Sequence, residues 1–345
     1  MKVVYSDSHL RHQPGQVISR GRPQDHFEIA RRAEELVAAA RRDGHDIIAP
    51  AAYGPGPRAA VHTPDYLDFL ARAFAEWQAL PDPTPAVQAH AYPNRRMQAR
   101  PTGIIGLAGY HMATNSCPIV EGTWEASCAA ADVAVHAAEL VLQGAPVAYA
   151  LCRPPGHHAF SDLAGGFCYL NNVAIAAQYM RRRLGRVAIL DIDVHHGNGT
   201  QGIFYDRSDV FFVSLHGDPS DFFPFFAGYA HESGEGAGLG YTLNLPLPPG
   251  TGDRDYLAAL DRALAAIRHF APDALLVSLG FDAYEADPIG VLKVTTGGFG
   301  EIGRHIGGFG LPTLLVQEGG YNCDALGANL SSFLSGFERG RASAE

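Results

Sequence analysis

The feature that most constrains this chain is a short apolar segment that runs directly into acids and histidines. Residues 187–190 are apolar, and residues 191–200 after them read DIDVHHGNGT. Residues two apart on an extended chain point to the same face, so Asp191, Asp193 and His195 are presented together where a buried strand meets its loop. Carboxylates that only cap backbone amides are the alternative. Burying so many such groups without a cation is costly, which favours a metal site.

Strand-like apolar runs alternate with helical segments along the chain. The predicted strands are residues 1–6, 147–152, 187–193, 210–216, 274–282 and 312–318. Apolar residues spaced three and four apart predict helices over 24–42, 64–79, 123–143, 171–183, 254–270, 296–307 and 324–338. This alternation predicts an α/β fold with a central, mostly parallel β-sheet flanked by helices on both faces. Ligands of such sheets bind beyond the carboxyl ends of the strands.

The length of the chain fits a single domain. Its 345 residues exceed the usual domain size, but α/β folds often reach such lengths as one unit, so we expect one domain over residues 1–345. Two Pro- and Gly-rich segments, 81–122 and 217–252, break the alternation. We expect them to be loop insertions that act as rims, lids or subunit contacts.

Charge and hydropathy restrict the classes of partner. The chain has 26 Lys and Arg against 36 Asp and Glu, a net charge of -10, which argues against nucleic-acid binding and suits a small cationic substrate better. The N-terminal residues lack a signal-peptide core, and no stretch reaches transmembrane length without Gly, Pro or charge. Five cysteines without C-x-x-C spacing read as reduced thiols. We therefore expect a cytoplasmic protein that does not bind membranes.

Three further motifs place polar side chains after predicted strands. His157 and His158 follow a Pro- and Gly-shaped turn, Asp282 ends a strand, and Tyr321 follows two glycines. Taken alone, each has an ordinary explanation: surface or core histidines, a backbone cap, and a packing tyrosine. Several strand ends that point at one place change that balance towards catalysis.

In this order, the motifs resemble those of the histone deacetylase superfamily, which has the arginase–deacetylase fold, over about residues 1–338. The segments that carry the resemblance are CRPPGHHA, GFCYLNN, DIDVHHGNGT, VSLH and EGGY. GTWE, HGDP and the early SDSH look most like the bacterial acetylpolyamine amidohydrolase branch.

The resemblance implies two ions. A catalytic zinc would be held by Asp193, His195 and Asp282, with an open position for water and the acyl oxygen. Iron(II) or cobalt would also suit this donor set, so the site is better specified than the metal. A structural potassium ion would be held by Asp191 and Ser214 and by backbone carbonyls near Asp193, His195 and Leu215.

The resemblance also implies catalytic roles. Asp191 would hydrogen-bond His157, and Asn198 would orient His158. A carboxylate partner stabilises imidazolium whereas the neutral Asn198 does not, so His158 should more readily stay neutral and act as the base. His157 would contribute electrostatically, and Tyr321 would donate to the developing oxyanion.

The same resemblance implies a narrow apolar slot for the substrate. Phe167 and Phe223 would flank it, Gly166 would offer its carbonyl to the scissile N–H, and Ile289 would lie near the rim. Acetylpolyamine enzymes line the slot mouth with acids and a tyrosine. Here Ile105, Ser116 and Phe167 stand in the matching places, so a long polyamine would find less charge and a shorter or less polar acyl amide becomes a plausible substrate.

The sequence therefore predicts a zinc-dependent amidohydrolase that removes an acetyl or other small acyl group from an amine. The alternatives are a protein acetyl-lysine deacetylase, a hydrolase of non-physiological small acyl amides, and a non-enzymatic acyl-ligand binding or scaffold protein. The insertions predict a walled entrance, which disfavours a protein substrate, and the intact catalytic positions disfavour the non-enzyme. A homodimer or homotetramer is expected, assembled through segment 81–122.

Overall fold

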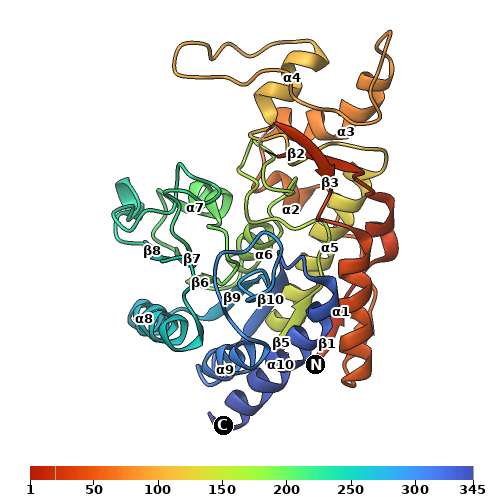
Figure 1. Cartoon of the computed structure of the whole chain (residues 1–345). Helices are drawn as coiled ribbons and strands as arrows, with labels where there is room; N and C mark the ends of the chain where they lie inside the picture. Colours follow the sequence, from red (N-terminus) through yellow and green to blue (C-terminus); the bar gives the residue numbers. More distant parts are fainter. Residues whose placement is uncertain (20, 345) are drawn as a thin grey trace.

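The computed structural model describes residues 1–19 and 21–344. Its main strands are β1 (Lys2–Val4), β4 (Asp46–Ile48), β5 (Val147–Ala150), β6 (Val187–Asp191), β7 (Val210–Gly217), β8 (Thr242–Leu247), β9 (Ala274–Leu279) and β10 (Thr313–Gln317). They form one eight-stranded sheet in the order β4-β1-β5-β10-β9-β6-β7-β8 (Figure 1). Every neighbouring pair is parallel, which confirms the predicted fold class.

Helices cover both faces of this sheet (Figure 1). The α-helices of the described residues are α1 (Ala30–Arg42), α2 (Gly56–Ala59), α3 (Pro64–Gln78), α4 (Ile104–His111), α5 (Thr123–Leu142), α6 (Asn172–Met180), α7 (Asn198–Phe204), α8 (Asp253–Phe270), α9 (Thr296–Gly307) and α10 (Cys323–Ala342). Helices α1, α8, α9 and α10 share one hydrophobic cluster with the sheet, and α5 and α6 share another.

Strand β6 shows why the central strands read as continuous apolar runs. Ala188 and Leu190 pack in the cluster of α1, α8, α9 and α10, while Val187 and Ile189 pack in the cluster of α5 and α6. All four side chains are buried. A parallel strand covered on both faces has no solvent-exposed side, so its polar residues are confined to its ends.

The structure places three elements differently from the sequence prediction. Segments 81–122 and 217–252, which we expected to be loop insertions, also contain α4 and β8. Glycine-rich flanks obscured β8, and its Pro246 is tolerated because β8 is an edge strand. The helix predicted from residue 24 begins at Ala30, because β3 (Arg22–Asp25) pairs with β2 (Gln16–Ser19) in an antiparallel hairpin.

The sheet order brings the sequence motifs together. Strands β5, β10, β9 and β6 are consecutive in the sheet, although they are far apart in the chain. Because all of them run in one direction, the loops after their carboxyl ends meet at one edge. Within the described residues, no helix combines the length and the apolar character needed to cross a membrane.

Candidate active site

Asp193, His195 and Asp282 converge beyond the ends of β6 and β9. One potential ligand atom from each lies within 4.8 Å of the others. His195 Nδ1 is 3.2 Å from Asp193 Oδ1 and 3.2 Å from Asp282 Oδ2. All three residues are buried. Two carboxylates and an imidazole directed at one point form a donor set that suits a divalent cation.

Backbone groups hold the two carboxylates in place. The amide of Val194 donates to Asp282 Oδ1 at 2.9 Å, and the amide of Gly319 donates to Asp193 Oδ2 at 2.8 Å. A side chain at Gly319 would collide with both carboxylates, and one at Gly280 would collide with Asp193. These glycines are therefore part of the site, and only their position after strands could have marked them in the sequence.

The electrostatics of this group favour a bound cation. Burial and the charge on Asp193 raise the pKa of Asp282 to about 7. Burial lowers the pKa of His195, but hydrogen bonds to Asp193 and Asp282 outweigh it and raise the pKa to about 9. Nδ1 of His195, which carries a proton when the ring is charged, lies 3.2 Å from one oxygen of each carboxylate. A divalent ion that bound these three side chains would replace this proton, so the residues present fit a metal.

The two tandem histidines have different partners. His157 Nδ1 donates to Asp191 Oδ2 at 2.9 Å, whereas His158 Nδ1 donates to Asn198 Oδ1 at 2.7 Å. Burial and the nearby charge on His157 lower the pKa of His158 well below its usual value. Burial also opposes charge on His157, but Asp193 and Asp191 raise its pKa to about 10. His158 is therefore a neutral imidazole with a free Nε2 lone pair.

Tyr321 stands on the loop after β10. The ring lies 4.7 Å from the Arg32 guanidinium and makes an edge contact with Phe167 at 5.5 Å between centroids. Burial raises the pKa of the Tyr321 phenol well above its usual value. The hydroxyl therefore stays protonated and can donate a hydrogen bond. Tyr321, His158 and His195 line the same cavity.

This cavity has a volume of about 680 Å³ and contains every residue predicted for the substrate slot, namely Gly166, Phe167, Phe223 and Ile289. Gly166 and Phe167 both have positive φ, 52° and 69°. A side chain at Gly166 would strike the His158 ring, so only glycine fits there. Left-handed backbone at a phenylalanine costs about 1–3 kcal/mol and is typical of functional sites.

Of the three residues that differ from the family pattern at the slot mouth, two lie in this cavity. Ser116 and Phe167 contribute to its lining. Ile105 does not, within the described residues: it lies on α4 with half of its surface exposed. Ile105 belongs to segment 81–122, which we expect to pack across a dimer, so its place at a slot mouth stays a prediction.

The structure adds contributors that the sequence did not reveal. The buried Glu318 accepts hydrogen bonds from the amides of Gly156 and His157 at 2.6 and 3.1 Å, which fixes the histidine turn. The hairpin of β2 and β3 also lines the cavity, through Val17 and Gln24 among others. The EGGY motif contains Glu318 but does not indicate its contacts, and no motif marks Val17 or Gln24, because these roles depend on contacts between distant segments.

Two residues predicted for potassium lie side by side. Asp191 on β6 pairs in register with Ser214 on β7, and both are fully buried. Leu215 follows Ser214 on the same strand. Asp191 Oδ1 accepts from the amide of Asp193 at 3.1 Å, while its Oδ2 faces His157. Asp191 thus connects this region to the tandem histidines.

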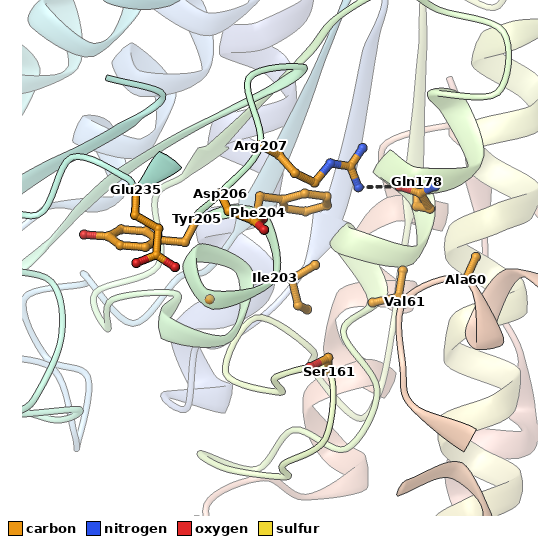
Figure 2. Close-up of a pocket in the computed structure, with 11 residues that line it drawn as sticks. Ala60, Val61, Ser161, Gln178, Ile203, Phe204, Tyr205, Asp206, Arg207 and Glu235 are labelled. Atoms are coloured by element: carbon orange, nitrogen blue, oxygen red, sulfur yellow. Dashed lines mark hydrogen bonds between the residues drawn. The ribbon is translucent and has the colours of Figure 1, made fainter. Parts of the chain in front are cut away.

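Figure 2 shows a separate cavity of about 350 Å³ near the end of α7. Its Arg207 donates to Gln178 Oε1 at 2.7 Å and pairs with Asp209 at 2.6 Å. The guanidinium is therefore already neutralised. The residues that line this cavity include neither a metal-capable group nor a histidine, so the candidate active site is the larger cavity.

Comparisons with known proteins agree with this geometry. The histone deacetylase domain family matches residues 23–337. The acetylpolyamine amidohydrolase of Burkholderia pseudomallei is 50% identical over 338 residues, which cover 98% of each chain. A crystal structure of acetylpolyamine aminohydrolase from that organism superposes with a TM-score of 0.96 at 48% identity and covers 99% of both chains. The HDA15 HD domain superposes with a TM-score of 0.80 at 29% identity, over 98% of this chain and 89% of that one.

Proposed function

Because this chain belongs to the histone deacetylase family, we propose that it is a zinc-dependent amidohydrolase that removes acetyl or another small acyl group from a small amine. The observation that carries the proposal is the convergence of three kinds of group on one cavity. These are the metal-capable triad of Asp193, His195 and Asp282, the neutral His158, and the protonated Tyr321. When bound, zinc supplies a Lewis acid that activates water and polarises the acyl carbonyl.

The residues of the chain supply the proton transfers. His158, with Nδ1 bonded to Asn198, accepts a proton from the attacking water on Nε2 and returns it to the leaving amine. Tyr321 donates a hydrogen bond to the acyl oxygen as negative charge develops there. His157, charged through Asp191 and Asp193, adds positive potential beside the reacting atoms. The Gly166 carbonyl is assigned to the scissile N–H.

We assign a structural potassium ion to the group around Asp191. The pairing of the buried Asp191 with the buried Ser214 on the neighbouring strand supports this assignment, because it brings a carboxylate and a hydroxyl oxygen close together. The backbone carbonyls of Asp193, His195 and Leu215 complete the proposed ligand set. In this arrangement the cation would also moderate the charge that Asp191 presents to His157.

The mouth of the cavity favours a substrate of low charge. Among the described residues that line the cavity, Asp221 is the only carboxylate. Most of the remaining lining is apolar, and Phe226 leaves 93% of its surface exposed. A polyamine with several ammonium groups would lack partners here, so we infer that neutral or singly charged amides are better substrates. The hairpin and the Phe222–Phe226 loop wall the cavity, which disfavours acetyl-lysine in a folded protein.

The assembly and the compartment are part of the same proposal. Segment 81–122 projects from the body of the molecule (Figure 1). Its Met97 and Ile105 leave 64% and 50% of their surface exposed to solvent. We infer a homodimer or homotetramer that covers these side chains, and sedimentation of the purified chain measures it. The five cysteines are free thiols, as expected for a cytoplasmic protein.

Turnover of acyl amides by the metal-loaded protein tests the function. We expect the zinc-reconstituted chain to hydrolyse a fluorogenic acetyl-lysine amide and small acetylated amines. His158→Ala should lower kcat by about a hundredfold or more while metal content is unchanged, because His158 is a base and not a ligand. A chain that binds acyl amides but turns none over would instead be the non-enzymatic binding protein.

A further inference from the structure

We propose that Asp287 is a positioning residue for Tyr321, an inference that rests on the proposed function. Asp287 lies on the loop after β9, and Tyr321 lies on the loop after β10. Its Oδ2 accepts hydrogen bonds from the amide of Tyr321 at 2.7 Å and from the amide of Asn322 at 3.2 Å. One carboxylate oxygen thus fixes the backbone from which the catalytic side chain extends.

The loop needs such an anchor because glycines precede Tyr321. Gly319 and Gly320 have no side chains to pack, and Gly320 has a φ of 114° that other residues rarely adopt. On the upstream side, Arg32 donates to the carbonyls of Gly320 and Glu318, both at 2.6 Å. Arg32 therefore fixes the loop before Tyr321. The amide of Tyr321 itself is bonded by Asp287.

The second oxygen of Asp287 extends the connection to the substrate slot. Oδ1 accepts from the amide of Ile289 at 3.0 Å, and Ile289 lines the cavity. Asn322 also donates from Nδ2 to the carbonyl of Ala286 at 2.8 Å, so three hydrogen bonds join the two loops. The same carboxylate therefore positions both Ile289 in the cavity wall and Tyr321, the hydrogen-bond donor.

This arrangement predicts a specific kinetic effect. A donor displaced by about 1 Å can cost a factor of about a hundred in rate, because stabilisation of the oxyanion depends on geometry. Asp287 does not line the cavity and donates or accepts no hydrogen bond with the metal-capable triad, although its charge lies near Asp282 and His195. Its loss should therefore reduce kcat through Tyr321 while metal content changes little, and any change in KM should come from the displaced Ile289 wall.

A double-mutant cycle separates positioning from general destabilisation. We expect Asp287→Ala to lower kcat at least about tenfold in the wild-type background and less than about threefold in a Tyr321→Phe background, because the donor is then already absent. Asp287→Asn keeps one acceptor oxygen and should recover part of the loss. Asp253→Ala removes a carboxylate that braces Thr295 in another loop, at 2.8 Å from its amide, and should leave kcat unchanged.

The outcomes distinguish this inference from the function on which it rests. Equal losses in both backgrounds, or loss of metal from Asp287→Asn, overturn the positioning role. An Asp287→Asn variant as active as the wild type in kcat, with the Asp287→Ala chain failing to fold, also overturns it. A wild-type chain that hydrolyses no acyl amide overturns the proposed function, and this inference with it.

Discussion

The charge state of a single side chain at this site depends on its hydrogen-bond partner. His157 and His158 are adjacent in the chain and both are buried, with ring centroids 4.0 Å apart. A carboxylate partner keeps His157 charged, whereas an amide partner leaves His158 neutral. The metal-capable triad follows the same rule, because its one imidazole lies between two carboxylates that favour its charged form. Predictions at this scale therefore change one partner at a time.

Asn198→Asp should move the acidic limb of the pH–rate profile to higher pH. The new carboxylate would stand where Asn198 Oδ1 now lies, 2.7 Å from His158 Nδ1, and would raise the pKa of His158 by favouring its charged form. Because the base must be neutral, activity would then be lost at a higher pH on acidification. The measurement is kcat/KM against pH. Asn198→Ala, which adds no charge, should not shift the limb upward, and an unmoved limb in Asn198→Asp would contradict the assignment.

Asp282→Ala should abolish activity and leave well under one metal ion per chain. Removing one carboxylate from a three-ligand site takes away both a ligand and part of the charge that binds the cation. Elemental analysis after dialysis measures the bound metal. Asp206→Ala, which removes an exposed acid away from this cavity, is the control and should retain metal and activity. Full metal retention with activity in Asp282→Ala would disprove the site.

At the scale of elements, a buried ionic group joins three segments that surround the site. Glu28, just before α1, accepts from Arg153 Nε at 2.8 Å and from Arg32 Nη1 at 2.9 Å. Arg32 lies within α1, and Arg153 lies after β5 in the turn that leads to the histidines. All three side chains are buried. This group fixes the helix, the histidine turn and the glycine loop relative to one another.

Glu28→Gln should destabilise the fold by about 3–5 kcal/mol near neutral pH, because it leaves two buried guanidiniums without their carboxylate. Burial opposes the charge on Glu28, but Arg153 and Arg32 lower its pKa to about 2. Because the pKa is lowered on folding, the charged carboxylate stabilises the fold above about pH 4.5. This stabilisation is lost as the pH falls towards about 2. Denaturant unfolding at about pH 7 and about pH 3 should therefore show a smaller difference between variant and wild type at the lower pH.

The matched control for this prediction is Glu35→Gln on the same helix. Glu35 pairs with Arg31 on the exposed surface of α1, so its loss should change the free energy of unfolding by less than about 1 kcal/mol. If both variants lost the same stability, or if the effect of Glu28→Gln did not depend on pH, the buried group would not have the role assigned to it.

At the scale of the whole molecule, the sheet order and the rim decide which substrates reach the site. The mouth combines a hairpin from the N-terminal part of the chain with the Phe222–Phe226 loop, and Asp221 is the carboxylate among its lining residues. We expect small neutral or singly charged acyl amides to be hydrolysed at least as well as acetylspermine. Acetyl-lysine within a folded protein should be a poor substrate.

Asp221→Asn should lower kcat/KM for acetylated diamines by about tenfold and leave neutral acyl amides unchanged, because one exposed charge pair contributes modestly. The measurement is a panel of neutral, singly charged and polycationic amides at low and high salt. Asp255→Asn, an exposed acid on α8, serves as the control. A strong preference of the wild type for the longest polyamine, weakening steeply with salt, would contradict this interpretation of the mouth.

The local sequence was sufficient for the features that depend on neighbouring residues. Alternating apolar runs predicted the α/β fold, and the two-residue spacing of Asp191, Asp193 and His195 placed them together at one strand end. These inferences succeed because strand periodicity and strand burial are recorded within a few residues. They were weaker where a strand is short or lies at an edge, as in β4 and β8, because such strands lack a full apolar run.

Only the tertiary structure determined how the distant parts of the site meet. The amide of Val194 bonds Asp282, 88 residues away, and the amide of Gly319 bonds Asp193, 126 residues away. Strand order, which no local pattern encodes, makes these contacts possible. The opposite pKa shifts of the two histidines, the need for Gly166 beside His158 and the hydrogen bond from Tyr321 to Asp287 also arise from packing. Each depends on burial and on charges contributed by segments that the chain brings together only when it folds.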